Sequence, residues 1–218
     1  MIRIDLIGPG DIDFHFRKLL GMSEKKLEEE IDKIAALLNP GEVELSLLPD
    51  DGICLEVAKR FKARGGRVIG LVPQDDKVFG IAHLRQYIDA KVENKPLFDE
   101  LINTGDWFRQ DLTKCLFGDV VLCLGLSPGT DGERAYGVYL YKIATGFKQG
   151  VKTPVTKIHP QARAGIKIPY TIILYTPFMI QKTVSPEEEA YTKKFGINLD
   201  YAHSASDLEK KLSILSRL

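Results

Sequence analysis

The chain has 218 residues, of which 44% are hydrophobic and 28% charged, and its 30 basic and 30 acidic side chains give a formal net charge of zero. This size and hydrophobic content suit one large domain or two small ones, with a core that needs no disulfide bonds. A neutral chain lacks the overall positive field that collects nucleic acid or anionic membranes, so neither is expected as a partner.

Cysteines, histidines and apolar runs narrow the class of protein further. The three cysteines, Cys54, Cys115 and Cys123, match no zinc or redox spacing, and the apolar runs around Cys54 and Cys123 predict core positions. The four histidines are scattered, so the sequence predicts no metal site and no cofactor. We find no signal-peptide pattern and no apolar run near the roughly 20 residues of a membrane span, and therefore expect a cytoplasmic protein.

Apolar strands and amphipathic helices alternate along the first third of the chain. Apolar residues spaced three or four apart indicate the helices, and turns rich in glycine or proline end them. The predicted elements are a strand at 2–8, a helix capped by Ser23, a strand at 43–48, a helix through Phe61 that ends at Gly65 and Gly66, and a strand at 67–73.

The remaining two thirds continue the alternation with two irregular interruptions. The predicted elements are a polar excursion at about 74–96, a short strand at 99–103, a helix through Phe108 and Leu116, a strand at 120–124, a helix after Gly129, a flap-like loop at about 149–169, a strand at 170–175, a short helix capped by Ser185 and a closing helix from Asp207.

Strands that are almost entirely apolar and alternate with helices predict an α/β fold of the Rossmann-like, doubly wound kind. We expect a mainly parallel sheet with helices on both faces, as a single nucleotide-binding domain over residues 1–218. Such sheets bind ligands beyond the carboxyl ends of their strands. Four turns fall at predicted strand carboxyl ends, namely 8–10, 49–52, 73–76 and 125–133.

The turn at 125–133 is the strongest candidate for a ligand site. A strand, a glycine-rich turn and a helix in that order place free backbone N–H groups and the positive end of a helix dipole at one point, which favours a phosphate. We expect Ser127, Gly129 and Thr130 to hold it, while Glu133 lies about one helical turn further on. The alternatives are that Thr130 only caps the helix and that Glu133 only complements the dipole.

Two other turns supply candidate walls for the same pocket. Gly8 and Gly10 follow the first strand, and Asp50, Asp51 and Gly52 follow the second. The aspartates would repel a phosphate, but they could bind ribose hydroxyls, a cation or a base amine. The alternative is a plain turn at 8–10 and an Asx-type turn that caps the following helix.

Several segments together resemble the Lonely Guy (LOG) family and its wider nucleotide-binding superfamily. Residues 48–58 resemble the family's glycine-rich turn and helix, 65–73 its G-G-x-V-I-G-V-x-P segment, 99–110 the segment with its catalytic arginine, and 125–133 its P-G-G-x-G-T-x-x-E motif. The similarity runs in one order over roughly residues 1–146. It implies a dimeric Rossmann-like protein, and an enzyme that hydrolyses the N-glycosidic bond of a nucleoside 5′-monophosphate.

The resemblance assigns roles to three further side chains. Glu133 would orient water and ribose hydroxyls, as a carboxylate does in glycoside hydrolysis. A gap-free alignment places Gln110 where the family has its catalytic arginine, with Arg109 next to it, so either would contact the leaving base. The exchange of arginine for Gln110 favours a second hypothesis, a non-catalytic sensor or carrier of a nucleotide or another phosphorylated ligand.

Aromatic residues near the candidate site form the next group of candidates. Trp107 and Phe108 could stack on a base, although we expect core packing. Tyr136, Tyr139 and Tyr141 follow the candidate turn on one helix and, by the resemblance, would face the partner of a homodimer; ordinary packing is the alternative.

Basic side chains of the flap are the last group. Lys152, Lys157 and Arg163 could guard the mouth of the pocket, although a solvated loop is the simpler explanation. Binding of single-stranded DNA, as in the superfamily's DNA-processing branch, is disfavoured by the zero net charge.

Overall fold

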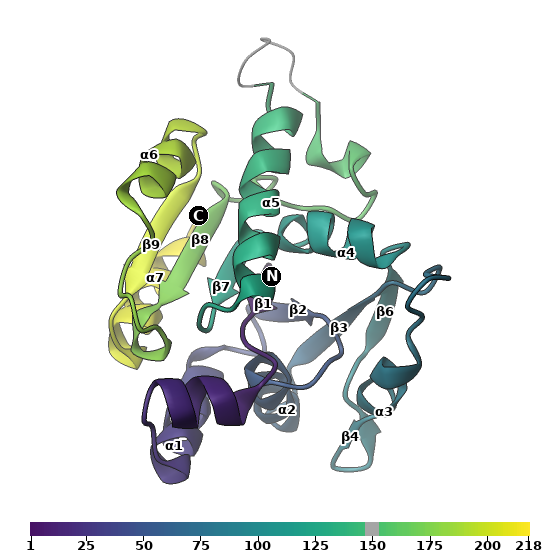
Figure 1. Cartoon of the computed structure of the whole chain (residues 1–218), viewed down its shortest axis with the longest axis vertical. Helices are drawn as coiled ribbons and strands as arrows, with labels where there is room; N and C mark the ends of the chain where they lie inside the picture. The colour runs from purple at the N-terminus through teal and green to yellow at the C-terminus, as the bar shows by residue number, and fades with distance from the viewer. Residues whose placement is uncertain (147–152) are drawn as a thin grey trace.

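A computed structural model describes residues 1–146 and 153–218 and confirms the predicted α/β fold (Figure 1). Its seven-stranded sheet has the order β6-β3-β2-β1-β7-β8-β9, and every neighbouring pair in it is parallel. The strands are β1 (Ile2–Ile7), β2 (Val43–Leu47), β3 (Arg67–Val72), β6 (Glu100–Asn103), β7 (Val120–Cys123), β8 (Thr171–Tyr175) and β9 (Asn198–Ala202).

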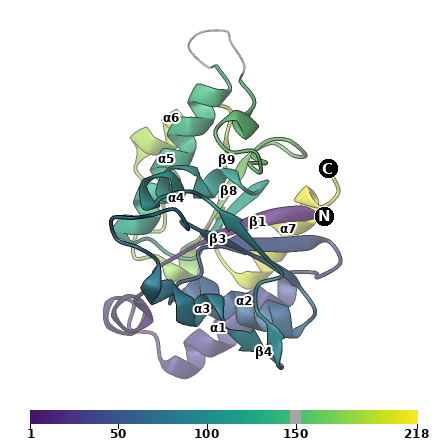
Figure 2. The same cartoon turned by 90° about the vertical axis from the view of Figure 1, so that its right-hand side faces the viewer.

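Helices cover both faces of this sheet, as Figure 2 shows from the side. The longer ones are α1 (Glu24–Leu37), α2 (Ile53–Ala63), α4 (Trp107–Thr113), α5 (Pro128–Ala144), α6 (Pro186–Lys194) and α7 (Ala205–Leu215). Side chains of α1, α2 and α7 pack into one apolar cluster with the sheet, and side chains of α5 pack into a second cluster on the other face. The residues of β1 and β2 are almost all buried because both faces are covered.

Several sequence expectations hold at the level of single residues. The hydroxyls of Ser23 and Ser185 cap α1 and α6, each accepting a backbone N–H three residues on. Gly65, with a φ of +83°, follows the last turn of α2 as a left-handed helix terminator. Cys123 is buried in the core and Cys54 is half-buried, and the three cysteines are free thiols.

Several short elements differ from the sequence prediction. The π-helix η1 (Asp13–Leu19) and the edge strand β9 were absent from it, because η1 is mostly exposed and β9 (Asn-Leu-Asp-Tyr-Ala) is polar. The 74–96 excursion is not wholly irregular. It contains η2 (Ala82–Leu84), α3 (Arg85–Ile88) and the hairpin of β4 (Lys91–Val92) and β5 (Lys95–Pro96).

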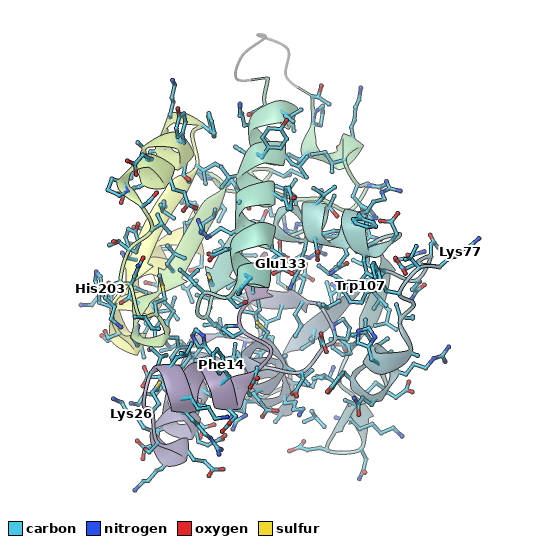
Figure 3. All side chains as sticks on the ribbon, in the orientation of Figure 1. Phe14, Lys26, Lys77, Trp107, Glu133 and His203 are labelled. Carbon is cyan, nitrogen blue, oxygen red and sulfur yellow. The ribbon has the colours of Figure 1, made fainter. Side chains whose placement is uncertain are left out.

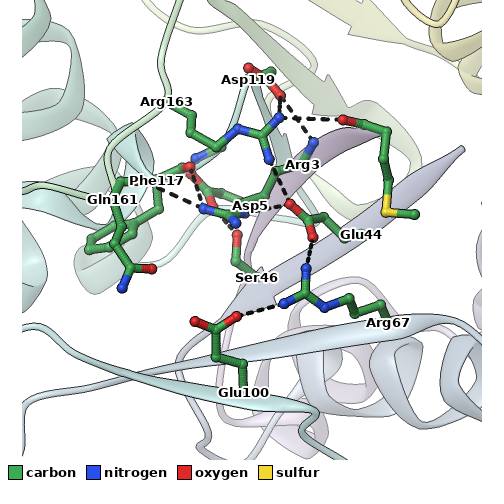
Figure 4. A network of polar contacts seen from close by, with 12 residues as sticks. Arg3, Asp5, Glu44, Ser46, Arg67, Glu100, Phe117, Asp119, Gln161 and Arg163 are labelled. Carbon is green, nitrogen blue, oxygen red and sulfur yellow. Dashed lines mark hydrogen bonds and ion pairs between the residues drawn. The ribbon is translucent and has the colours of Figure 1, made fainter. Parts of the chain in front are cut away.

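An ion-pair network joins the amino-terminal ends of the strands (Figure 4). The Glu44 carboxylate pairs with Arg3 at 3.0 Å, with Arg163 at 2.6 Å and with Arg67 at 2.5 Å. Arg163 also pairs with Asp119 at 3.1 Å. Arg163 therefore fastens its loop to the sheet and does not guard a pocket at the carboxyl ends.

The rest of the flap-like loop has a defined path where it is described. Residues 149–152, with the candidate Lys152, lie outside the described residues. From residue 153 onward the chain forms the short helix η4 (Val155–Lys157) and packs Val155 and Ala164 into the second cluster. Among the described helices, none is both long and apolar enough to cross a membrane.

Candidate functional site

The turns that follow β1 and β2 pack directly on each other. The Ile53 N–H donates to the Pro9 carbonyl oxygen at 3.2 Å. Gly52 has a φ of +119°, and a Cβ there would lie 2.5 Å from that same oxygen. A Cβ at Gly8 would lie 2.5 Å from the Ile53 side chain. The close approach of one turn to the other thus requires glycine at both positions, whether or not a ligand binds.

The turn after β7 meets the same assembly. Gly125 has a φ of +119°, and a Cβ there would lie 2.9 Å from the Phe178 carbonyl oxygen and 3.0 Å from His15 Nε2. The buried His15 ring bonds that oxygen through Nε2 at 2.9 Å. Residues from the ends of β1, β7 and β8 are therefore held against η1, which brings the predicted turns together at the carboxyl edge of the sheet.

Asp50 and Asp51 make local bonds in this structure. The Asp50 carboxylate accepts the Asp51 N–H, and the Asp51 carboxylate accepts the Gly52 N–H, both at 2.8 Å. Such bonds shape the turn before α2, in line with the Asx-type alternative. Asp51 and Gly10 are exposed, and a ligand role for Gly8, Gly10, Asp50, Asp51 and Gly52 stays a prediction.

The first turn of α5 is closed by a capping box in which Ser127, not Thr130, is the N-cap. Ser127 Oγ accepts the Thr130 N–H at 3.3 Å, and Thr130 Oγ1 accepts the Ser127 N–H at 3.1 Å. The two hydroxyl oxygens are 2.6 Å apart, so one hydroxyl proton lies between them. The second hydroxyl proton is left available to a ligand.

The rest of that turn is open to the solvent. Pro128 has no N–H group to offer, and the Gly129 N–H has no partner within the described residues. A Cβ at Gly129 would meet nothing within 4 Å. Two donors at the positive end of a 17-residue helix are consequently left without a partner within the described residues, the Gly129 N–H and one hydroxyl of the Ser127–Thr130 pair.

Glu133 is tied into a buried ion pair that the sequence analysis did not anticipate. Its carboxylate lies 2.9 Å from Lys114 Nζ, and the two side chains are 11% and 6% exposed. Burial alone would lower the pKa of Lys114, but the Glu133 charge outweighs it and the pKa is raised above its ordinary value. Lys114 lies in η3 (Lys114–Leu116), and its place within the apolar run 112–117 was the signal that could have identified it.

The two candidates for the family arginine do not meet Glu133. Gln110 is fully buried; its Oε1 accepts the Thr104 hydroxyl, and its Nε2 has no partner among the described residues. Arg109 is exposed, and its Cδ lies 3.1 Å from where a Cβ at Gly105 would be. No contact within the described residues joins either side chain to Glu133 or to the 125–130 turn.

Trp107, which Figure 3 labels, and Phe108 are the first two residues of α4. Phe108 is 65% exposed, so the expected core packing is wrong for it. The Trp107 ring stacks on His83 with ring centres 5.6 Å apart, and its N–H donates to the Gly80 carbonyl. Trp107 is therefore fixed against the 74–96 segment.

A cavity of about 550 Å³ opens beside the candidate turn, between α5 and the segment that leads into α6. Leu126 and Asp131, on either side of the turn residues 127–130, both line it. Its other lining residues are Arg134, Ala135, Val138, Tyr139, Gln181, Thr183, Val184, Ser185, Glu188, Tyr191, Thr192 and Phe195. The cavity thus adjoins the turn in sequence, although none of Ser127, Gly129 and Thr130 lines it.

The guanidinium of Arg134 lies beneath this cavity. Its side chain is 5% exposed and pairs with Asp131 at 3.0 Å and with Glu188. Arg134 Nε is buried without a hydrogen-bond partner within the described residues. The described residues contain no group of three or more histidine, cysteine or acidic side chains that could hold a metal ion.

Comparisons with known proteins find similarity in structure only. No protein-family model and no curated protein sequence matches the chain. The molybdenum cofactor carrier protein MCP from Chlamydomonas reinhardtii is 16% identical, with a TM-score of 0.55, over 100% of this chain and 99% of that one. The molybdenum cofactor binding protein from the bacterium Rippkaea orientalis is 14% identical, with a TM-score of 0.54, over 98% and 96%. At these identities the likeness shows the Rossmann-like α/β fold.

Proposed function

We propose that this protein binds a phosphorylated small molecule and carries it without hydrolysing it. The observation that carries the proposal is the placement of the cavity relative to Glu133. Successive residues of an α-helix are rotated by about 100°, so Asp131, Arg134 and Val138 share one face of α5, whereas Glu133 projects from the opposite face. A ligand in the cavity would be separated from the Glu133 carboxylate by the helix itself.

A hydrolase would also need an accessible donor for the leaving base, and the buried Gln110 does not supply one. Hydrolysis of a ribosyl bond needs a carboxylate near the sugar and a donor on the leaving base. Here Lys114 neutralises Glu133, while Gln110 is buried against Thr104. The LOG-like residues Gly129, Thr130 and Glu133 remain the support for a phosphoribohydrolase, which we retain as the second candidate.

The phosphate would bind at the first turn of α5. The Gly129 N–H and one hydroxyl of the Ser127–Thr130 pair have no partner there within the described residues, and the helix dipole favours an anion at the same place. The remainder of the molecule would extend past Leu126 and Asp131 into the cavity. A cavity of about 550 Å³ is the size that small-molecule sites usually have.

The names of the two structural relatives make the molybdenum cofactor the first ligand to test. The donor set fits such a ligand in one respect, because the turn offers hydrogen-bond donors to a phosphate group. The described residues offer no cluster of side chains for the metal, so the protein would hold the organic part. When bound, the cofactor would bring its redox chemistry as cargo, and the side chains named here would only bind and orient it.

The test is calorimetric titration with purified molybdenum cofactor and with nucleoside 5′-monophosphates, each followed by chromatography for released base. We expect saturable binding with no release of base. Gly129→Ala should weaken binding at least about tenfold, because its Cβ would stand at the phosphate position and obstruct one charge-assisted hydrogen bond. The matched control is Gly132→Ala, since a Cβ there also meets nothing within 4 Å.

Two results would overturn the proposal. Base release that Glu133→Gln abolishes would establish the hydrolase instead. Failure of every phosphorylated compound to bind would exclude phosphorylated small molecules as the ligand of this protein. Neither alanine variant is expected to lower the thermal midpoint, so a loss of affinity in Gly129→Ala could not be attributed to unfolding.

A further inference from the structure

We propose that the cavity beside α5 selects a planar heterocycle that carries at least two N–H donor groups on one edge, as guanine and pterins do. The inference rests on the proposed function, since it assigns the ring-binding half of the same ligand. It is drawn from Asp131, Arg134 and Glu188, which play no part in the candidate hydrolase chemistry.

The two carboxylates are held in place and still have acceptor capacity. One oxygen of Asp131 pairs with Arg134 at 3.0 Å, and one oxygen of Glu188 pairs with the other end of the same guanidinium. The second oxygen of each carboxylate has no hydrogen-bond partner within the described residues, and the side chains are 50% and 33% exposed. Arg134 also lines the cavity, but its side chain is 5% exposed and both ends of its guanidinium pair with the two acids, so we assign it to orienting them.

The charge of this group favours hydrogen-bond donors in the ligand. The two carboxylates and the guanidinium carry one net negative charge as a group, so this part of the cavity wall favours N–H donors over an anionic ring edge. Lys142 Nζ already lies 5.5 Å from the Tyr139 ring centre and 5.0 Å from the Phe195 ring centre. Lys142 thus already supplies a cation to these two aromatic rings. A neutral ligand ring with N–H donors therefore fits the cavity better than a cationic ligand would.

The lining of the cavity suits a flat ring. Leu126, Ala135 and Val138 form an apolar floor, and the tyrosines Tyr139 and Tyr191 stand at its rim with 53% and 59% of their surfaces exposed. Apolar walls with a few fixed polar groups are the usual composition of a site that reads one edge of a heterocycle. The phosphate turn at 127–130 adjoins this floor, so one ligand could occupy both.

Guanosine, inosine and adenosine 5′-monophosphates test the inference, because they share ribose and phosphate and differ in ring donors. Guanine has two adjacent donor groups, hypoxanthine has one, and adenine has only its amino group. We expect guanosine 5′-monophosphate to bind at least about tenfold more tightly than the other two, since each loses a hydrogen bond to a carboxylate. Free pterin, followed by its fluorescence, distinguishes a pterin ligand from a guanine nucleotide.

Three variants test which side chains select the ring of the ligand. Glu188→Gln and Asp131→Asn should each remove most of the guanosine preference, whereas Glu187→Gln, on the same helix but outside the cavity lining, should keep it. Equal affinity of the unaltered protein for all three nucleotides would overturn this inference and leave the proposed function standing. Binding of none of the three nucleotides, of pterin or of the molybdenum cofactor would overturn both. Because the first comparison uses the unaltered protein, it does not depend on how a variant folds.

Discussion

Lys114 and Glu133 remove one positive and one negative charge from water at the junction of η3 and α5. A buried pair of this kind contributes little net stability, but removing one partner leaves an uncompensated buried charge. The ion pair thus gives Glu133 a structural role, because it holds the first half of α5 against η3. Asp111 belongs to the same neighbourhood, because burial and the Glu133 charge raise the pKa of its carboxyl.

Lys114→Met should lower the free energy of unfolding by about 3–5 kcal/mol, because Glu133 would remain buried and unpaired. The double variant Lys114→Met, Glu133→Gln should recover much of this loss. Urea denaturation provides the measurement, and Lys33→Met is the control. Lys33 pairs with Glu30 at 3.2 Å on the surface, so its loss should cost less than about 1 kcal/mol. Similar losses for Lys114→Met and Lys33→Met would contradict the structural role.

Asp5 is a second buried charge site, on β1 near the ion-pair network of Figure 4. Burial raises the pKa of Asp5 to about 7 from an ordinary value of 3.8, although hydrogen bonds from the Ser46 hydroxyl and the Gly118 N–H favour its charged form. Between pH 4 and 7 the folded protein therefore binds this proton more tightly than the unfolded chain does. The contribution of Asp5 to stability is present below the unfolded pKa and is lost as the pH rises through about 7.

Asp5→Asn removes this titration. Its stability relative to the unaltered protein should rise as the pH is raised from about 4 to about 7, by an amount on the order of a few kcal/mol. Denaturation midpoints at several pH values measure the difference. A stability difference that stays constant across this range would show that Asp5 does not titrate there.

At the scale of elements, α5 connects the candidate site to the core. Its amino end carries the capping box and the two unpaired donors, and its middle packs closely on η3 and on Tyr170, which precedes β8. Gly137 permits this packing, because a Cβ there would lie 2.8 Å from the Cys115 Cβ and 3.3 Å from the Tyr170 hydroxyl. That hydroxyl donates to the Cys115 carbonyl at 2.7 Å, so neither neighbour can move freely.

Gly137→Ala should therefore destabilise the protein by about 1–3 kcal/mol through overpacking, although alanine is the better helix former. Gly132→Ala in the same helix has no neighbour within 4 Å and should stabilise it by up to about 1 kcal/mol. Chemical denaturation of the two variants compares them directly. Equal effects would mean that helix propensity, and not the contact with η3, decides the outcome.

At the scale of the whole molecule, the two edges of the sheet differ in character. The amino-terminal edge is joined by ion pairs between Arg3, Glu44, Arg67 and Arg163, which bind distant segments together. The carboxyl edge carries the glycine turns, the open end of α5 and the neighbouring cavity. The proposed ligand site and the charged network therefore lie at opposite edges of the sheet.

The outer face of α5 is also the surface through which we predict a homodimer. Tyr136, Tyr139 and Ile143 are exposed by 48%, 53% and 52%. Tyr141 is half-buried, and its ring packs on that of Tyr170. A homodimer through this face stays a prediction. Ile143→Glu should then shift the sedimentation coefficient to that of a monomer, whereas Ile214→Glu, at a position on α7 that is 61% exposed, should not. An unaltered protein that sediments as a monomer would contradict it.

Local pattern by itself determined most of the fold of this protein. Apolar runs, caps such as Ser23 and terminators such as Gly65 depend on neighbours within a few residues, so the strands β1, β2, β3, β7 and β8 and the long helices could be read from the chain. The same logic located the turn at 125–133. The sequence pattern did not predict β9, because it is a polar edge strand, or η1, because most of its surface is exposed.

Tertiary structure alone decided what the site residues contact. Lys114 and Glu133 are 19 residues apart, and only the packing of α4 and η3 on α5 makes them partners. Gln110 could be aligned with a catalytic arginine, yet its burial depends on how α4 meets β6 and Thr104. The cavity needs Arg134 and Glu188, which lie on different helices. Side-chain direction relative to distant elements is not encoded in local spacing, so the sequence predicted a candidate site at one turn and the fold determined which groups lie beside that turn.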